Sequence, residues 1–239
     1  MNLLAVDTAG AACSAALIEN GRLRAEFFTE FDQTHARYVM ELIHSLMDQA
    51  GIKARDIDAY GVTKGPGSFT GLRIGIATIK GMALAHDRPA VGISSLLALA
   101  HPWLSIARGL VCPVIDARKS EVYSEIYRFS DTGFTIVKPV CVSAPGTLVQ
   151  KISRLAEPCL FIGSGAVLYR DLIIKKLGPL AFFAPDTAAQ VRAASVGGLA
   201  YKRILEGKGG KAAGLAPVYI RKSDAERKSK TSAVIRPAE

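Results

Sequence analysis

Several features are missing from the sequence, and each absence argues against a class of protein or a kind of site. No apolar run approaches the roughly 20 residues that a membrane-spanning helix needs, so we expect no membrane association. The first seven residues lack a basic side chain and end in Asp7, so we predict no signal peptide and a cytoplasmic protein. Four cysteines are present without any C-x-x-C pair, which argues against a zinc knuckle or a thioredoxin-type site (Cys13, Cys112, Cys141 and Cys159).

A local pair of metal-binding histidines is also missing. The four histidines, His35, His44, His86 and His101, include no two that are four residues apart. At that spacing two side chains share one helix face and can hold one ion. No Ser-His-Asp order stands out either, so we predict neither a metal site nor catalytic residues. We expect His35, at the start of a predicted helix, to form local or interface contacts.

The bulk composition predicts a folded protein with an uneven positive charge. Hydrophobic residues make up 49% of the 239 residues and the mean hydropathy is +0.23, which indicates a sizeable core. The net charge is +9, and residues 201–239 hold ten Lys and Arg against four Asp and Glu. We expect residues 223–239 to form a basic, weakly ordered tail. This tail can attract an RNA backbone or simply remain solvated, and the sequence favours neither alternative.

Apolar patterns predict two successive β-β-β-α-β-α units. The first has strands at 3–6, 15–18 and 23–28, a helix from near Thr34 to Gly51, a strand at 60–63, a helix at 70–85 and a strand at 90–93. The second has strands at 110–115, 121–129, 134–142 and 159–162, with helices after 146, at 167–177 and at 188–205. We therefore predict a duplicated α/β fold with subdomains 1–105 and 106–222 and a cleft between them. This order resembles the actin/Hsp70/sugar-kinase superfamily.

A glycine-rich segment, Lys64–Gly75, leads from a predicted strand into a helix. Gly65 and Gly67 can adopt positive φ, and Ser68 or Thr70 can cap the helix. Within the helix, one row of small residues holds Gly71 and Gly75, and another holds Ala77, Gly81 and Ala85. Because each glycine in a helix costs roughly 1 kcal/mol relative to alanine, we expect close helix packing, in this chain or with a partner. The phosphate alternative is weaker, since neither G-x-x-x-x-G-K-[ST] nor G-x-G-x-x-G is present.

Six segments together resemble the TsaB (YeaZ) family: Asp7-Thr8, Cys13–Leu17, Thr34-His35, Gly65–Gly75, Pro113–Tyr123 and Pro217–Arg221. The resemblance implies a scaffold subunit for the synthesis of N6-threonylcarbamoyladenosine at position 37 of tRNAs. It implies a homodimer that also binds the TsaD transferase, with the TsaE ATPase joining and tRNA engaged through the complex. The relative TsaD carries metal-binding histidines after its own glycine segment, whereas residues 93–99 here hold no metal ligand. Any ATP and metal would then belong to partner subunits.

The same resemblance implies which residues form sites. The partner or dimer interface would comprise Gly65, Pro66, Gly67, Ser68, Phe69, Thr70, Gly71, Leu72, Arg73, Gly75, Ile76, Ile79 and His35. Residual nucleotide contacts would involve Asp7, Thr8, Gly163 and Gly165. We expect the bulky Arg118 and Lys119 to obstruct the second phosphate turn and weaken ATP turnover. The alternative of an autonomous actin-like ATPase or metallopeptidase-like enzyme stays open.

Overall fold

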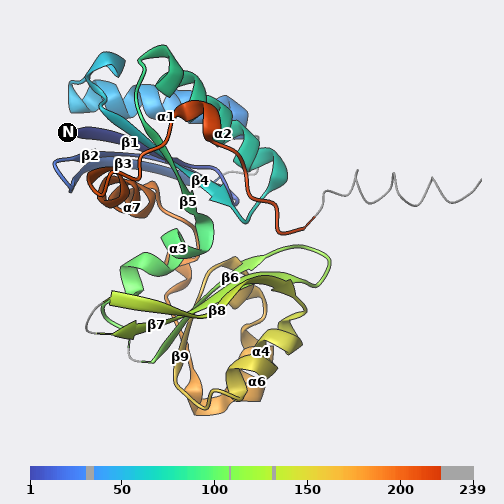
Figure 1. The fold of residues 1–239 in the computed structure, drawn as a ribbon. Coiled ribbons are helices and arrows are strands. Elements are labelled where there is room, and N and C mark those ends of the chain that lie inside the picture. Colours follow the sequence, from blue (N-terminus) through green and yellow to red (C-terminus); the bar gives the residue numbers. More distant parts are fainter. Residues whose placement is uncertain (31–34, 108, 131–132, 222–239) are drawn as a thin grey trace, which may run out of the picture.

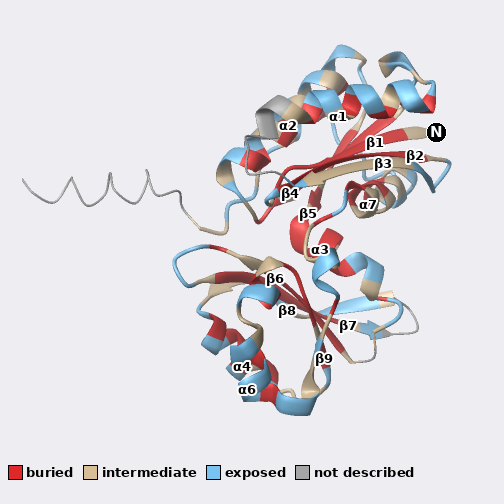
Figure 2. Cartoon of the chain, turned by 180° about the vertical axis from the view of Figure 1, so that it is seen from behind, coloured by how far each residue is buried: buried red, intermediate tan, exposed pale blue. Residues whose placement is uncertain are grey.

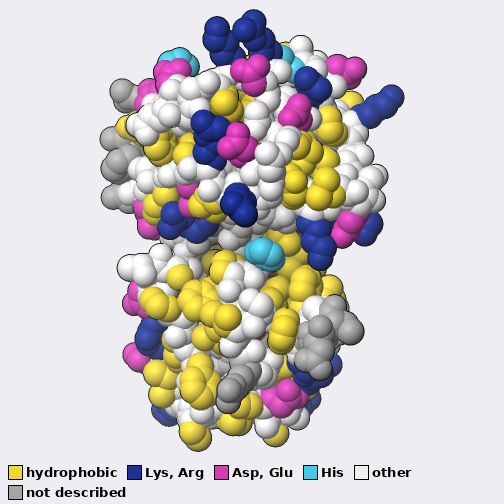
Figure 3. Space-filling view, turned by 90° about the vertical axis from the view of Figure 1, so that its left-hand side faces the viewer, with side chains coloured by type: hydrophobic (Ala, Val, Ile, Leu, Met, Phe, Trp, Pro, Cys, Tyr) yellow, Lys and Arg dark blue, Asp and Glu magenta, His cyan; other side chains and the backbone are white. Residues whose placement is uncertain are grey.

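The computed structural model describes residues 1–30, 35–107, 109–130 and 133–221. The predicted tail 223–239 and the helix opening at Thr34 lie outside these residues. Two five-stranded sheets form two halves that meet at a narrower waist (Figures 1 and 3). No helix in the described ranges is long and apolar enough to cross a membrane.

The first sheet has the strand order β3-β2-β1-β4-β5. Its strands are β1 (Asn2–Asp7), β2 (Ala12–Glu19), β3 (Arg22–Glu30), β4 (Ala59–Gly65) and β5 (Ala90–Ser94). The first three strands pair antiparallel, and β4 and β5 continue the sheet in parallel with β1. Asn20 and Gly21 both have positive φ, 50° and 81°, in the predicted tight turn between β2 and β3.

The second sheet repeats this order as β8-β7-β6-β9-β10. Its strands are β6 (Leu110–Asp116), β7 (Val122–Ser130), β8 (Gly133–Ser143), β9 (Cys159–Ile162) and β10 (Ala181–Phe183). Strand β10 has only three residues, too few to show an alternating pattern in the sequence. The predicted duplication is confirmed, because each sheet has three antiparallel strands followed by two parallel ones.

Helices cover both faces of each sheet (Figures 1 and 2). In the first half, α1 (His35–Ala50) and α2 (Phe69–Ala85) cover one face and α7 (Ala193–Leu205) covers the other. In the second half, α4 (Pro145–Ser153), α5 (Ser164–Leu168) and α6 (Arg170–Leu177) cover one face. The short α3 (Ser95–Ala100), capped by Ser94, was not predicted. Single 3₁₀ turns occupy 54–56, 101–103, 178–180, 186–188 and 212–214.

Two predicted helices have different boundaries in the structure. The helix predicted at 167–177 is interrupted at Tyr169, whose φ of −110° and ψ of 21° separate α5 from α6. The helix predicted at 188–205 begins at Ala193, because Arg192 is extended and Gln190 reaches across to Glu30 of β3 with a 2.7 Å hydrogen bond. A local change of backbone conformation overrides the apolar pattern in the first place, and an extended residue with a distant contact does so in the second.

Two helices, α7 and α3, lie where the two halves meet. Helix α7 follows the second sheet in the chain but packs on β1, β2 and β4, so the predicted range 106–222 does not describe its packing. Helix α3 follows the first sheet but contacts β6. One apolar cluster therefore runs from the first sheet through both helices to the second sheet, including Val196 and Leu99. The Ser14 hydroxyl of β2 accepts a 3.0 Å hydrogen bond from the Ala193 N–H at the start of α7.

After α7 the described part of the chain returns across the first half and then contacts the second half. We call residues 210–221 the C-terminal strap. Gly210 pairs with Ala90 at the edge of β5, and the 3₁₀ turn Ala212–Gly214 packs on α2. The strap then passes the end of β4 toward the turn between β6 and β7 (Figure 1).

Candidate functional site

The glycine segment joins β4 to α2 as predicted. The Ser68 hydroxyl caps α2 by accepting a 3.2 Å hydrogen bond from the Gly71 N–H. Gly65 has a φ of 113°, which explains the glycine there. Gly67 lacks a positive φ, contrary to our expectation. Position 67 requires a glycine because a Cβ atom there would lie 2.4 Å from the Ala9 carbonyl oxygen.

Helix α2 packs directly on the turn between β1 and β2. The Thr8 hydroxyl donates a 2.7 Å hydrogen bond to the Gly71 carbonyl, and the Ser68 N–H donates one of the same length to the Ala9 carbonyl. A Cβ atom on Gly71 would lie 2.0 Å from the Thr8 carbonyl oxygen, and one on Gly75 would lie 2.4 Å from the Thr8 hydroxyl. The row of Gly71 and Gly75 therefore allows α2 to pack on the turn between β1 and β2 of the same chain. Our assignment of it to a neighbouring helix was wrong.

The predicted interface residues divide into two groups by burial. Gly65, Pro66, Gly71, Leu72, Gly75, Ile76 and Ile79 are buried within this chain, and Gly67 and Phe69 are half-buried. Ser68, Thr70 and Arg73 are exposed. His35 begins α1, but its side chain lies outside the described part of the structure. The most accessible part of α2 is an exposed stripe that comprises Thr70, Arg73, Ala77, Gly81 and Leu84.

Asp7 lies fully buried beneath this turn at the end of β1. Its Oδ1 atom accepts a 3.2 Å hydrogen bond from the Ala9 N–H, and its Oδ2 atom has no hydrogen-bond partner among the described residues. Burial raises the pKa of Asp7 from 3.8 to about 7, while the nearby Thr63 hydroxyl and the Ala9 N–H offset part of this increase. Because ionising this buried carboxyl is already unfavourable, a second negative charge beside it would be disfavoured.

A cavity of about 660 Å³ lies between the two halves. It is lined by Phe28, Glu30, Asp116, Ser164, Val167, Leu168, Asp186, Thr187, Ala189 and Gln190. The four residues predicted for residual nucleotide contact are buried and do not line it: Asp7, Thr8, Gly163 and Gly165. A Cβ atom on Gly163 would lie 2.4 Å from the Val114 carbonyl oxygen, so this glycine serves the close packing of α5 on β6.

Carboxyl groups line this cavity. Its lining includes those of Glu30, Asp116 and Asp186, and no Lys or Arg among the described residues. Asp186 forms an ion pair with Arg170.

The turn after β6 has an unusual backbone. Arg118, Lys119 and Ser120 have φ values of 62°, 54° and 56°, in the left-handed region that favours glycine. The Asp116 carboxylate accepts a 2.9 Å hydrogen bond from the Arg118 N–H and supports the turn. Neither basic side chain lines the cavity. The expected obstruction of the second phosphate turn by Arg118 and Lys119 stays a prediction.

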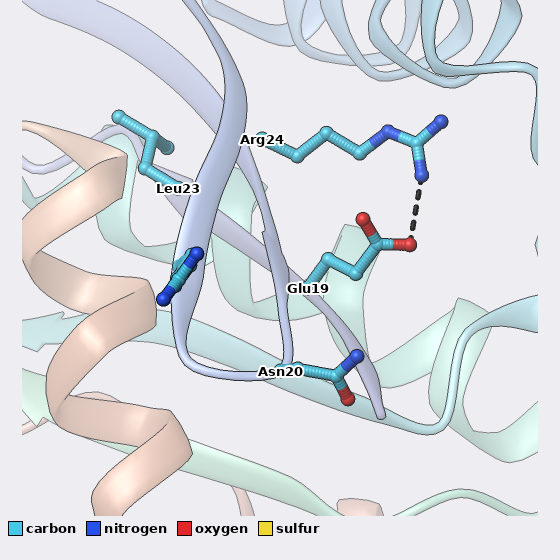
Figure 4. A pocket seen from close by; sticks show the side chains of 5 residues that line it. Glu19, Asn20, Leu23 and Arg24 are labelled. Atoms are coloured by element: carbon cyan, nitrogen blue, oxygen red, sulfur yellow. Dashed lines mark hydrogen bonds and ion pairs between the residues drawn. The ribbon is translucent and has the colours of Figure 1, made fainter.

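A second hollow of about 510 Å³ lies beside the hairpin of β2 and β3 (Figure 4). Its lining comprises Glu19, Asn20, Arg22, Leu23 and Arg24. The Arg24 guanidinium forms a 2.8 Å ion pair with the Glu19 carboxylate. It also donates a 2.8 Å hydrogen bond to the carbonyl of Ala50, the last residue of α1. These contacts fasten α1 to the hairpin. In the described ranges no three His, Cys, Asp or Glu residues are grouped so that they could hold a metal ion.

One aromatic contact at the start of α2 was not predicted. The rings of Phe69 and Tyr219 stack with centroids 4.6 Å apart, and the Arg73 guanidinium lies 3.8 Å from the Phe69 ring centroid. The Arg73 Nε donates a 2.9 Å hydrogen bond to the Tyr219 hydroxyl. Tyr219 is 146 residues from Arg73 in the chain, so no local pattern could have paired them.

Sequence comparisons give consistent matches along the chain. A family model described as TsaD, tRNA N6-adenosine threonylcarbamoyltransferase, matches residues 29–229. The tRNA threonylcarbamoyladenosine biosynthesis protein TsaB of Bacillus subtilis is 30% identical over 231 residues, which are 95% of this chain and 97% of that protein. TsaB of Escherichia coli is 32% identical over 174 residues, or 72% of this chain and 75% of that protein.

Solved structures agree with these matches. The structure of YeaZ from Pseudomonas aeruginosa has a TM-score of 0.74 and 29% identity, and the alignment covers 91% of this chain and 99% of that one. A ROK hexokinase from Thermus thermophilus has a TM-score of 0.51 at 11% identity, covering 85% and 100% of the two chains, and shows the duplicated actin-like fold alone. The chain therefore belongs to the TsaB family of tRNA threonylcarbamoyladenosine biosynthesis proteins.

Proposed function

We propose that this chain is a non-catalytic scaffold that forms a homodimer and binds the TsaD transferase during threonylcarbamoyladenosine formation on tRNAs. The TsaE ATPase would join this assembly, and tRNA would be engaged through the complex. The chain would need no cofactor of its own, since ATP and a metal would belong to its partners. Its site of action would be the cytoplasm.

The observation that carries this proposal is the exposed stripe of α2. Ala77, Gly81 and Leu84 are three and four residues apart and share one helix face. Leu84 is 57% exposed, and Met40 on the adjacent α1 is 50% exposed. Small residues beside exposed apolar ones allow another helix to approach closely and to cover apolar area. A homodimer or a TsaD contact through this stripe would bury these side chains.

The interior of the cleft supports the non-catalytic part of the proposal. The turn after β1 is occupied by α2, because Thr8 and Ala9 are bonded to Gly71 and Ser68. The cavity itself is lined by carboxyl groups. The hydrogen bonds of Thr8 and Ala9 with α2 disfavour the phosphate contacts on which an ATPase of this fold depends.

The test is an arginine placed on the stripe. Gly81→Arg adds a side chain where a Cβ atom meets nothing within 4 Å, so the monomer should fold normally. Gly146→Arg is the matched control, since Gly146 on α4 is equally open. The molar mass is measured by light scattering for each variant alone and mixed with TsaD. We expect Gly81→Arg to remain monomeric and fail to bind TsaD, while Gly146→Arg behaves as the parent chain.

Unchanged dimerisation and TsaD binding by Gly81→Arg would show that the stripe is not the contact surface. ATP hydrolysis by the purified chain, abolished by Asp7→Ala, would contradict the non-catalytic assignment independently of the contact surface.

A further inference from the structure

The C-terminal strap is attached to the first half by a small number of hydrogen bonds and by the apolar contacts of Ala212 and Leu215. Gly210 exchanges two backbone hydrogen bonds with Ala90, of 3.0 and 3.3 Å. The Lys80 ammonium of α2 donates a 2.8 Å hydrogen bond to the Ala213 carbonyl. The Val218 N–H donates a 2.7 Å hydrogen bond to the Lys64 carbonyl at the end of β4. Only Ala212 of the strap is fully buried, so the strap lies on the surface over α2.

The aromatic contact at the start of α2 is part of this attachment. Tyr219 contributes its ring to the stack with Phe69 and its hydroxyl to the hydrogen bond with Arg73. Tyr219 remains 40% exposed, so its position depends on these two contacts more than on burial.

The next two residues attach the strap to the second half. Ile220 packs against the apolar cluster of Leu96, Ala117 and Tyr123 beside the turn between β6 and β7. The Arg221 guanidinium donates a 2.8 Å hydrogen bond to the Glu121 carboxylate, and its side chain is only 14% exposed. Within three residues, the strap thus changes from contacts with α2 to contacts with the second half.

We propose that the C-terminal strap is a releasable latch that couples the angle between the two halves to the exposed surface at the start of α2. A rotation that opens the cleft must separate Arg221 from Glu121 or Tyr219 from Arg73, because both contacts lie within one short extended segment. Release exposes the Phe69 ring and frees the Arg73 side chain. This inference goes beyond the proposed scaffold role and does not depend on it.

The composition of the strap suits repeated release. Gly207 and Gly209 precede it and Gly210 is its first residue, and Gly207 has a φ of 69° just after the end of α7. Its regular structure is limited to the single turn Ala212–Gly214. Segments with few buried apolar contacts open at a lower free energy than the whole protein. Release therefore requires no unfolding of either sheet.

The experiment uses Tyr219→Ala and Arg221→Ala in the full chain, with Val218→Ala as the matched control. The Val218 side chain is 42% exposed and its hydrogen bond uses the backbone, so the control should leave the latch closed. Hydrogen exchange measured by mass spectrometry reports release of residues 211–221. Spin labels on Ser45→Cys of α1 and Gln150→Cys of α4 report the distance between the halves. A Cys141→Ser background removes the half-buried native thiol, since Cys13, Cys112 and Cys159 are buried.

In both variants, and not in the control, we expect exchange in the strap to accelerate. For Tyr219→Ala the acceleration should be roughly 5- to 150-fold, the range for losing one stacked pair and one hydrogen bond. For Arg221→Ala it should be roughly 10- to 150-fold, the range for losing one hydrogen bond between charged groups. The distance distribution between the labels should broaden at the same time, with exchange in α7 unchanged. Faster strap exchange with an unchanged distance distribution would overturn the coupling. Unchanged exchange, or acceleration spread equally over all peptides, would overturn the latch itself.

Discussion

Two glycines on the same helix should respond oppositely to alanine, which tests the packing of α2 on the turn after β1. At Gly81 the new methyl group meets nothing within 4 Å, and the gain in helix propensity is about 1 kcal/mol. At Gly71 the methyl carbon would lie 2.0 Å from the Thr8 carbonyl oxygen, a backbone atom that cannot rotate away. The helix must move by about 1 Å, at a cost of about 1–3 kcal/mol for overpacking. Losing the hydrogen bond between Thr8 and Gly71 adds about 1 kcal/mol.

The assay is thermal and urea unfolding of the two variants beside the parent chain. For a chain of this length, 1 kcal/mol changes Tm by about 2–4 °C. At concentrations where the chain is monomeric, we expect Gly81→Ala to raise Tm by about 2–4 °C and Gly71→Ala to lower it by about 5–15 °C. The control is internal, since both changes add the same methyl group to the same helix. Equal effects of the two substitutions, or stabilisation by Gly71→Ala, would refute the packing of α2 on Thr8.

Three further predictions concern single side chains. The pKa of Asp7 is about 7 in the folded state and about 3.8 in the unfolded state. The free energy of unfolding should therefore fall by up to about 4 kcal/mol as pH rises from 4 to 7. Asp7→Asn should flatten this dependence in urea titrations, and an equally steep profile would contradict the prediction. Ser68→Ala removes the cap of α2 and should cost about 1 kcal/mol, measured by the urea midpoint, with no effect if the cap is unimportant. Ser14→Ala leaves the buried Ala193 N–H unpaired and should cost about 1–3 kcal/mol in the same assay; a neutral result would argue against the docking of α7 on β2.

The fold was largely predictable because its elements have local signals. The apolar pattern of α1, with Val39, Ile43 and Leu46 buried, and the turn at Asn20-Gly21 depend only on nearby residues. The repeated strand order was predictable because both units show the same succession of apolar segments. Short elements escaped prediction, since α3 and β10 span six and three residues.

The candidate site was less predictable, because it depends on contacts between distant segments. The sequence identified the two rows of small residues on α2, but which row faces inward depends on where Thr8 lies. The lining of the cavity combines Glu30 with Asp116 and Asp186, from three separate parts of the chain. The strap contacts of Tyr219 and Arg221 likewise have no counterpart in any local pattern.

The packing of α7 on the first sheet has a consequence for the synthesis of the chain. The apolar face of the first sheet that includes Leu3 and Ala5 is covered by Val196 and Ala200 of a helix encoded after the second sheet. This face is therefore covered only after the ribosome has added residues 193–205.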